Sequence, residues 1–149
     1  MPTYAVTTMQ GRLSVQQKEA IAKEITRIHS AVTGAPSFFA QVLFYELAEG
    51  NAFIGGAPVT ADQIFVCGQI RDGRTAQQKT ALIEKILEAA AAAAQTQKFD
   101  IWVYIADLVP GQMAEFGHIL PPSGRELEWM ASLPSEDYER MTAIGHGRG

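Results

Sequence analysis

The chain has 149 residues, of which 47% are hydrophobic and 19% are charged, and its formal net charge is -4. This length suits one domain with a core of its own, and the composition excludes a disordered or fibrous chain. The acidic balance does not predict nucleic-acid binding, and no apolar run approaches the roughly 18 residues of a membrane span. We therefore expect a cytoplasmic protein with neither nucleic acid nor membrane as a partner.

The first predicted unit consists of a strand, a helix and a second strand. Residues 3–7 and 40–46 are rich in β-branched and aromatic side chains, which predicts the two strands. Between them, residues 15–32 carry apolar side chains at three- and four-residue spacing, which predicts an amphipathic helix. Ser14 and Gln17 have the spacing of a capping box, so we expect the helix to begin there.

A second unit repeats this order further along the chain. The Gly-Arg and Gln-Gln-Lys of residues 11–18 reappear at residues 73–79, and Thr75 with Gln78 again forms a capping box. The helix predicted after this box runs over residues 76–94 and ends in a run of six alanines. The strands predicted on either side of it are residues 63–70 and 100–106.

Two β-α-β units predict a mixed α/β (α+β) fold, in which one four-stranded sheet carries both helices on one face. The crossover connection makes the two strands of each unit parallel. The units span about residues 2–47 and 63–108 of a single domain, and residues 109–149 form an extension of turns with one short helix near residues 126–133. The other face of the sheet lacks a cover, so we expect a homo-oligomer.

Pro2 is the first candidate for chemistry. Removal of Met1 before a small residue would leave a secondary amine at the start of the chain. Such an amine titrates near neutral pH, and lower beside cations, so that it can act as an acid or a base. The structural alternative is that Pro2 only opens a strand, where its missing N–H does no harm.

Two arginines flank the turn before the second helix. Arg71 and Arg74 lie next to the predicted helix start at Thr75, and helix starts attract anions. Two guanidiniums at this place predict a clamp for a carboxylate or a phosphate. The alternative is a solvated turn in which Asp72 pairs weakly with one of them.

Three further side chains could take part in a site. His29 lies on the apolar side of the first helix and Tyr104 in the last strand, where a core histidine and a buried tyrosine are the simpler interpretations. Glu115 has apolar neighbours, a setting that suits a carboxylate for use as a base, whereas a surface turn acid is the alternative. The single cysteine, Cys67, is predicted to be buried and inert, and the dispersed histidines predict no metal site.

Taken together, these residues resemble the cis-3-chloroacrylic acid dehalogenase group of the tautomerase superfamily. The likeness spans nearly the whole chain and includes residues 50–54, residues 101–104 and the pair Glu128-Trp129. It implies a tautomerase-like fold, a homotrimer, a small carboxylate substrate and no cofactor. The six positions that carry the functional likeness are Pro2, His29, Arg71, Arg74, Tyr104 and Glu115.

The resemblance also implies a role for each of these six residues. The protonated proline nitrogen would deliver a proton to C-2 of an unsaturated acid. The two arginines, helped by the histidine, would hold the carboxylate and draw electron density toward it. The glutamate with the tyrosine would activate a water for attack at C-3, giving a product such as malonate semialdehyde.

The chain departs from that group around the implied pocket. Ala35 and Phe39, in the loop of residues 33–39, stand where the dehalogenase has a hydroxyl residue and a smaller aliphatic one, and Phe116 and His118 replace a tyrosine and an arginine. Two alternatives therefore stay open. One is keto-enol tautomerisation of a 2-oxo acid such as phenylpyruvate, which needs no water-activating carboxylate. The other is an inactive trimeric interaction protein.

Overall fold

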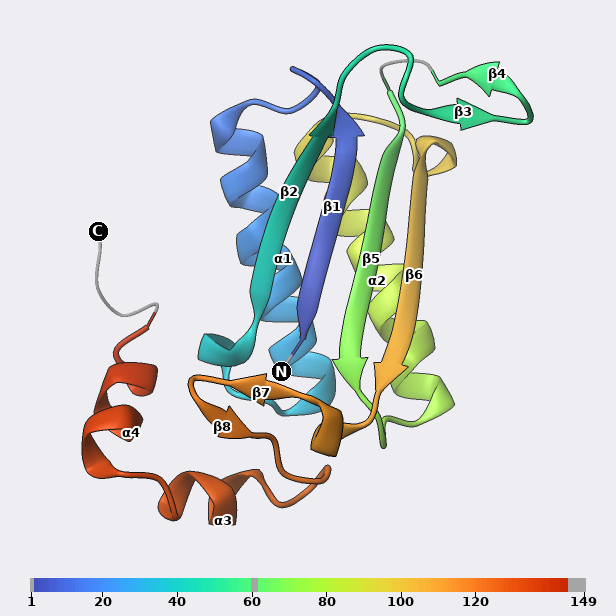
Figure 1. The fold of residues 1–149 in the computed structure, drawn as a ribbon. Helices are drawn as coiled ribbons and strands as arrows, with labels where there is room; N and C mark the ends of the chain where they lie inside the picture. The colour runs from blue at the N-terminus through green and yellow to red at the C-terminus, as the bar shows by residue number, and fades with distance from the viewer. Residues whose placement is uncertain (1, 60–61, 145–149) are drawn as a thin grey trace.

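The computed structural model describes residues 2–59 and 62–144, which form a four-stranded sheet with two long helices on one face (Figure 1). The strand order is β2-β1-β5-β6. β2 is parallel to β1 and β6 is parallel to β5, whereas β1 and β5 are antiparallel. The predicted fold is therefore confirmed. The strand bounds are β1 Thr3–Met9, β2 Gln41–Leu47, β5 Ile64–Arg71 and β6 Ile101–Leu108.

Both long helices begin at the predicted capping boxes. α1 (Val15–Thr33) follows Ser14, whose hydroxyl accepts the Gln17 N–H at 3.1 Å. α2 (Ala76–Ala94) follows Thr75, which is capped in the same way. These local bonds satisfy backbone donors that the first helical turn leaves open. The predicted starts of both helices are therefore confirmed.

The core lies between the helices and the sheet. α1 buries one apolar stripe and α2 another, and the two helices pack side by side against the strands. Each large aliphatic side chain that is fully removed from water contributes about 1.5 to 3 kcal/mol, so this layer dominates the stability. The central side chains of the core are Val6, Ile21, Ile25, Ile28, Ile64, Val66, Leu82 and Ile86.

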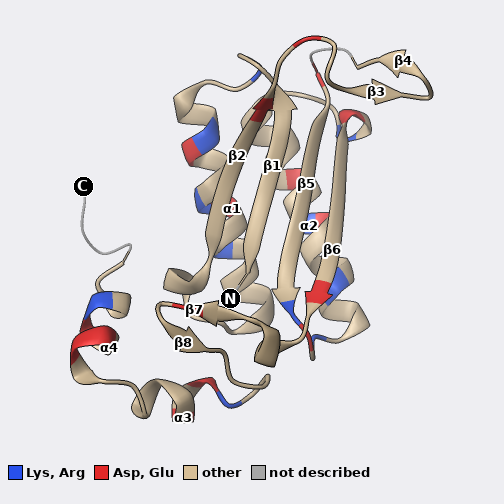
Figure 2. Cartoon of the chain, viewed as in Figure 1, with Lys and Arg blue, Asp and Glu red and all other residues tan. Residues whose placement is uncertain are grey.

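The opposite face of the sheet has no helix on it. Figure 2 shows charged positions on the helices and near the strand ends, and none over the middle of this face. Tyr45, Trp102 and Tyr104 are exposed there. Cys67, predicted to be buried, is only half-buried, because its strand position points to this uncovered face. The arrangement agrees with the expected need for a partner surface.

A small hairpin extends beyond one end of the sheet. Its strands are β3 (Phe53–Ile54) and β4 (Ala57–Pro58), and both apolar side chains of β3 are exposed. A cavity of about 380 Å³ lies between this hairpin and the uncovered face. The hairpin is absent from the sequence prediction because two-residue strands carry too little alternation to be recognised.

The C-terminal extension is more ordered than the sequence predicts. The expected short helix is present as α3 (Glu126–Ala131). A hairpin precedes it and a further helix, α4 (Ser135–Thr142), follows it. The hairpin strands are β7 (Ala114–Glu115) and β8 (His118–Ile119). A second apolar cluster around Phe39, Leu120 and Met141 attaches the extension to the domain. The remaining 3-10 turns are η1 Ser37–Phe39, η2 Lys98–Asp100 and η3 Pro110–Gln112.

The described part of the chain contains no helix that is both long and apolar enough to cross a bilayer. The end of the predicted extension, residues 145–149, lies outside the described residues.

Candidate active site

The start of β1, the end of β5 and the β7–β8 hairpin lie at the same end of the sheet (Figure 1), and several of the predicted site residues belong to these segments. Pro2 directly precedes β1 and is buried. Its carbonyl accepts the N–H of Gln41 at 3.0 Å, which fixes the start of β1 beside the start of β2. Arg71 is the last residue of β5, and because β5 is antiparallel to β1, its end lies at this same edge.

His29 reaches the site from the last turns of α1. The side chain is 3% exposed, and its Nδ1 lies 2.9 Å from the Tyr4 hydroxyl. Burial lowers the pKa of His29 to about 3, and the positive charges of Arg74 and Arg71 act in the same direction. Burial also raises the pKa of Tyr4, so the phenol keeps its proton. The tautomer of the imidazole decides which of the two groups is the donor in their hydrogen bond. His29 is therefore neutral, and Nε2 is its second hydrogen-bonding atom.

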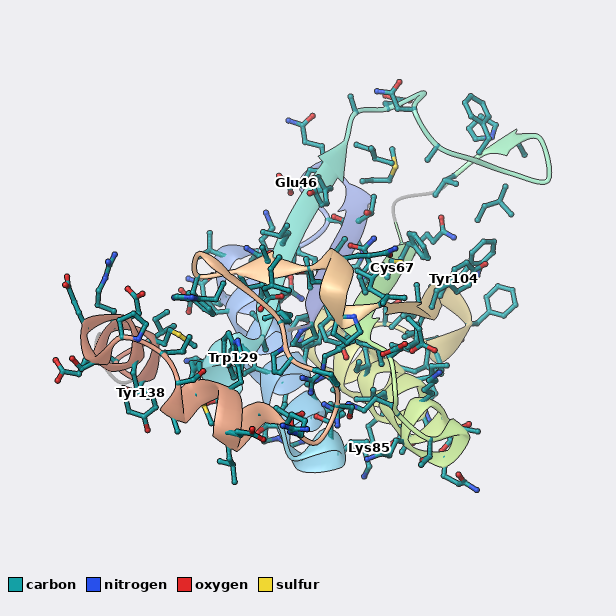
Figure 3. The ribbon with its side chains drawn as sticks, turned by 60° about the horizontal axis from the view of Figure 1, so that its bottom comes forward. Glu46, Cys67, Lys85, Tyr104, Trp129 and Tyr138 are labelled. Atoms are coloured by element: carbon teal, nitrogen blue, oxygen red, sulfur yellow. The ribbon has the colours of Figure 1, made fainter. Side chains whose placement is uncertain are left out.

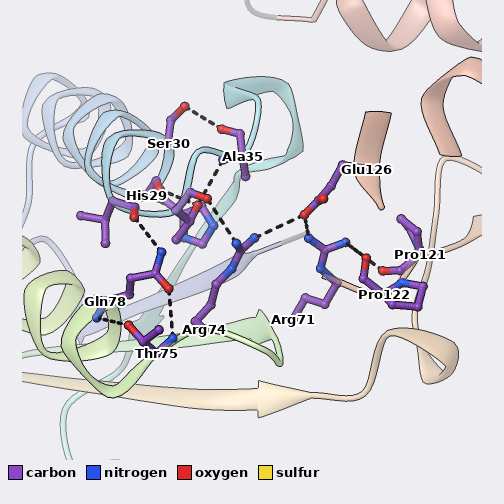
Figure 4. A network of polar contacts seen from close by, with 12 residues as sticks. His29, Ser30, Ala35, Arg71, Arg74, Thr75, Gln78, Pro121, Pro122 and Glu126 are labelled. Atoms are coloured by element: carbon purple, nitrogen blue, oxygen red, sulfur yellow. Dashed lines mark hydrogen bonds and ion pairs between the residues drawn. The ribbon is translucent and has the colours of Figure 1, made fainter. Parts of the chain in front are cut away.

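The polar partners of Arg71 come from the C-terminal extension (Figure 4). Its side chain is 1% exposed. Nη1 donates to the carbonyls of Pro121 at 2.8 Å and Pro122 at 3.4 Å, and Nη2 donates to the Glu126 carboxylate. Its Nε is buried without a hydrogen-bond partner among the described residues. The guanidinium thus contributes charge to the site while most of its donors are already used.

Arg74 is the more available of the two arginines. One Nη donates to the carbonyl of Thr33 at 3.2 Å, and the other lies 3.8 Å from Glu126 Oε1. Burial, and then the neighbouring Arg71, lower the pKa of Arg74 from an ordinary value that is far above neutrality. Neither arginine pairs with Asp72, the partner considered from the sequence. Figure 4 shows that Glu126 lies between the two guanidiniums instead.

Glu126 is a site residue that sequence reasoning missed. Burial by itself would raise the pKa of Glu126, but hydrogen bonds and the two guanidiniums lower it below its usual value. The carboxylate is therefore ionised. Its position at the start of the predicted short helix gave no sign of a partner 55 residues away, since Arg71 and Glu126 are brought together only by the path of the extension.

Glu115 lines a cavity of about 540 Å³ that also includes Thr3, the neighbour of Pro2. Phe39 and Phe116 lie on the same cavity, with their ring centroids 6.1 Å apart. Phe116 has a φ of 53°, a left-handed conformation that the tight β7–β8 turn imposes and that non-glycine residues seldom adopt.

Ala35, which the sequence places beside the pocket, is buried, and its carbonyl accepts a hydrogen bond from the Ser30 hydroxyl at 2.6 Å.

His118 lies on β8, directly opposite Glu115 of β7. Its Nε2 is 2.9 Å from Asp137 Oδ2 on α4, and its ring meets Trp129 edge-on. These contacts connect the hairpin with both short helices of the extension. His118 therefore has a structural role, because it links the β7–β8 hairpin to α4.

Tyr104 is not brought to this site by its own chain. It is 55% exposed on the uncovered face, so the sequence interpretation of a buried tyrosine is wrong. In the register, Arg71 pairs with Leu108, four residues beyond Tyr104, which is about 13 Å along the strand. Figure 3 shows Tyr104 on the side of β6, away from Trp129 of the extension. Its ring contacts are with Phe65 and Trp102.

The site and the fold can be compared with known proteins. The family described as "Putative oxalocrotonate tautomerase enzyme" matches residues 1–132. The chain belongs to this tautomerase family. A crystal structure of a member of the cis-3-chloroacrylic acid dehalogenase family is 33% identical, with a TM-score of 0.91 over 95% of this chain and 99% of that one. The predicted membership of the tautomerase superfamily, in the group of that dehalogenase, is confirmed.

Two further relatives differ in how much of this chain they match. "Probable tautomerase LL0574" from Lactococcus lactis subsp. lactis (strain IL1403) is 45% identical over 56 residues, which are 38% of this chain and 90% of that protein. The relative is thus about as long as one β-α-β unit. A structure described as "R7 fused 4-OT wild type asymmetric trimer" is 28% identical, with a TM-score of 0.71 over 85% of this chain and 98% of that one.

Proposed function

We propose that this tautomerase-family protein, once Met1 is removed, uses Pro2 to add water to small 3-substituted unsaturated carboxylates. With a halogen at C-3 the reaction is a hydrolytic dehalogenation that ends in malonate semialdehyde. The observation that carries the proposal is the position of Glu115, which lines the same cavity as Thr3, the residue after Pro2. The arginine pair and His29 lie at the same end of the sheet.

The proposed reaction divides the work among these groups. Arg74 and Nε2 of His29 hold the substrate carboxylate, and the enclosed charge of Arg71 adds to the attraction. Electron density drawn toward the carboxylate makes C-3 electrophilic. Glu115 takes a proton from a water molecule while the water oxygen bonds to C-3. The protonated Pro2 nitrogen delivers a proton to C-2. Loss of hydrogen halide from the adduct then gives the aldehyde.

Tyr104 can join this chemistry only from another subunit. It is exposed on the uncovered sheet face, the surface that most needs a partner. We therefore propose a homotrimer in which Tyr104 of one subunit completes the water-activating side of the next site. The described assembly of the fused 4-OT relative as a trimer supports this arrangement.

Keto-enol tautomerisation of a 2-oxo acid such as phenylpyruvate is the second candidate. It is favoured because one chain supplies every group that it needs. Pro2 and a carboxylate anchor suffice, and Tyr104 is not required. The name of the Lactococcus relative also supports it. In this reaction the neutral Pro2 nitrogen acts as a base that moves one proton between oxygen and carbon.

The substitution Glu115→Gln separates the two reactions. Progress curves by NMR with cis-3-chloroacrylate and with phenylpyruvate are recorded on protein whose loss of Met1 is verified by mass. Removal of the water-activating base is expected to lower hydration by about 10² to 10⁴-fold and to spare tautomerisation. Glu136→Gln, an exposed acid on α4, is the matched control. Equal loss of both reactions in the Glu115 variant would contradict its proposed role.

Covalent labelling tests whether the protein is an enzyme at all. A 3-halopropiolate is expected to add one adduct to the Pro2 nitrogen of the processed chain. A mass that stays unchanged after prolonged incubation, with no turnover of either substrate, would favour an inactive interaction protein.

A further inference from the structure

The Glu126 carboxylate lies between the two arginines of the proposed anion site. It accepts a hydrogen bond from Arg71 Nη2 and lies 3.8 Å from Arg74 Nη2. Its side chain is 17% exposed, compared with 1% for Arg71 and 9% for Arg74. Three charges thus share one poorly hydrated region, and each is felt more strongly than on an open surface.

The segment of residues 121–126 is held firmly in place. The carbonyl oxygens of Pro121 and Pro122 both accept hydrogen bonds from Arg71 Nη1, and Glu126 accepts one from Nη2. Ser123 packs closely over the turn of residues 71–74. A Cβ added to Gly73 would lie 2.8 Å from the Cβ of Ser123. Packing and hydrogen bonds therefore hold the Glu126 carboxylate in a fixed position within the site.

The charges of this region sum to a single positive charge. Arg71 and Arg74 contribute two, Glu126 removes one, and His29 is neutral. The protonated Pro2 nitrogen and the Glu115 carboxylate of the proposed reaction offset each other. One carboxylate on the substrate balances what remains. A second carboxylate would find no unbalanced positive charge and would face the negative charge of Glu126.

We propose that Glu126 is a specificity-determining residue, whose carboxylate offsets one guanidinium so that the site accepts monocarboxylates and rejects dicarboxylates. This rests on the proposed function in one respect, that the arginine pair binds the carboxylate of the substrate. Selection by net charge needs no contact between Glu126 and the substrate. It also gives a role to Arg71, whose two Nη groups are already hydrogen-bonded within the chain.

The test is the relative affinity for a mono- and a dicarboxylate that do not react. Propionate and malonate are titrated into the Met1-free protein and followed by NMR. Glu126→Gln keeps an oxygen for the Arg71 hydrogen bond and removes the charge. It is expected to improve malonate binding relative to propionate about tenfold, the order of one poorly screened unit charge a few ångströms away.

Two controls separate charge from packing. Glu128→Gln removes a neighbouring carboxylate that is 68% exposed and paired with Arg125, and it should leave the affinity ratio unchanged. Glu126→Asp keeps the charge and should also preserve the ratio. If the Glu126→Gln variant does not fold, Glu126→Ala carries the same expectation.

The outcomes distinguish this inference from the proposed reaction. A wild-type affinity ratio in folded Glu126→Gln protein that still turns over its substrate would overturn the role of Glu126 and leave the reaction standing. The expected shift in ratio without turnover by the wild-type protein would support Glu126 and overturn the reaction. A shift of the same size in Glu128→Gln would also overturn the role of Glu126, because long-range charge would then explain it.

Discussion

Acid should weaken this fold in part through one buried histidine. A histidine in the unfolded chain takes up a proton near pH 6.5, whereas burial lowers the pKa of His29 in the folded chain to about 3. The unfolded state therefore binds one more proton than the folded state between these values. The free energy of unfolding falls as the pH is lowered through this window, and the contribution is fully present above it.

The size of the effect follows from a single proton. Each pH unit inside the window removes about 1.4 kcal/mol, so acidification from about pH 7.5 to about pH 4.5 removes about 2.6 kcal/mol through His29. Carboxylates with lowered pKa, Glu126 among them, also destabilise the fold in acid, so the measurement has to be a difference. His29→Gln is the reference, because it keeps an acceptor for the Tyr4 hydroxyl and does not titrate.

Urea denaturation followed by circular dichroism measures this difference. Both proteins are unfolded at a series of pH values, and the free energy of unfolding of the wild type should fall more steeply with acid than that of His29→Gln. Parallel curves over the whole range would refute the reasoning. They would mean that His29 takes up its proton as easily in the folded protein as in the unfolded chain.

Two further predictions concern the sheet and its uncovered face. Gly68→Ala would place a Cβ 2.4 Å from Tyr4 Cε1, so thermal or urea unfolding should show a loss of about 1 to 3 kcal/mol, whereas Gly111→Ala meets nothing within 4 Å and should change little. A Gly68 variant as stable as the Gly111 variant would show that Tyr4 is not held rigidly. If Tyr104 serves the site of a neighbour, mixing inactive Glu115→Gln and Tyr104→Phe subunits at equal amounts should restore about a quarter of wild-type hydration, because one site in each mixed trimer is intact. A mixture that stays inactive after subunit exchange would place Tyr104 outside the chemistry.

Both β-α-β units could be predicted from the sequence because their signals are local. A capping box is read over four residues, and Ser14 and Thr75 each begin a helix where this spacing indicates it. The apolar spacing of α1 and α2 likewise needs one segment at a time. The strands followed from their composition, and the parallel pairing within each unit followed from the connection.

The candidate site could be predicted only in part because its members meet through the path of the chain. Glu126 acts on Arg71 across 55 residues, and no local pattern connects them. The exposure of Tyr104 depends on which face of the sheet the helices cover, which its own strand does not reveal. α4 was missed because it is only eight residues long and buries a single side chain, Met141.

The two halves of this chain are alike in shape but unequal in what they can offer. β1 begins at Thr3 and β5 at Ile64, so Gln63 holds in the second half the place that Pro2 holds in the first. The nitrogen of Gln63 is tied up in a peptide bond and can never become a free amine. That half supplies Arg71 and Arg74 instead. One polypeptide that carries two units can place different residues at equivalent positions, whereas a chain of one unit repeats the same residues in every copy.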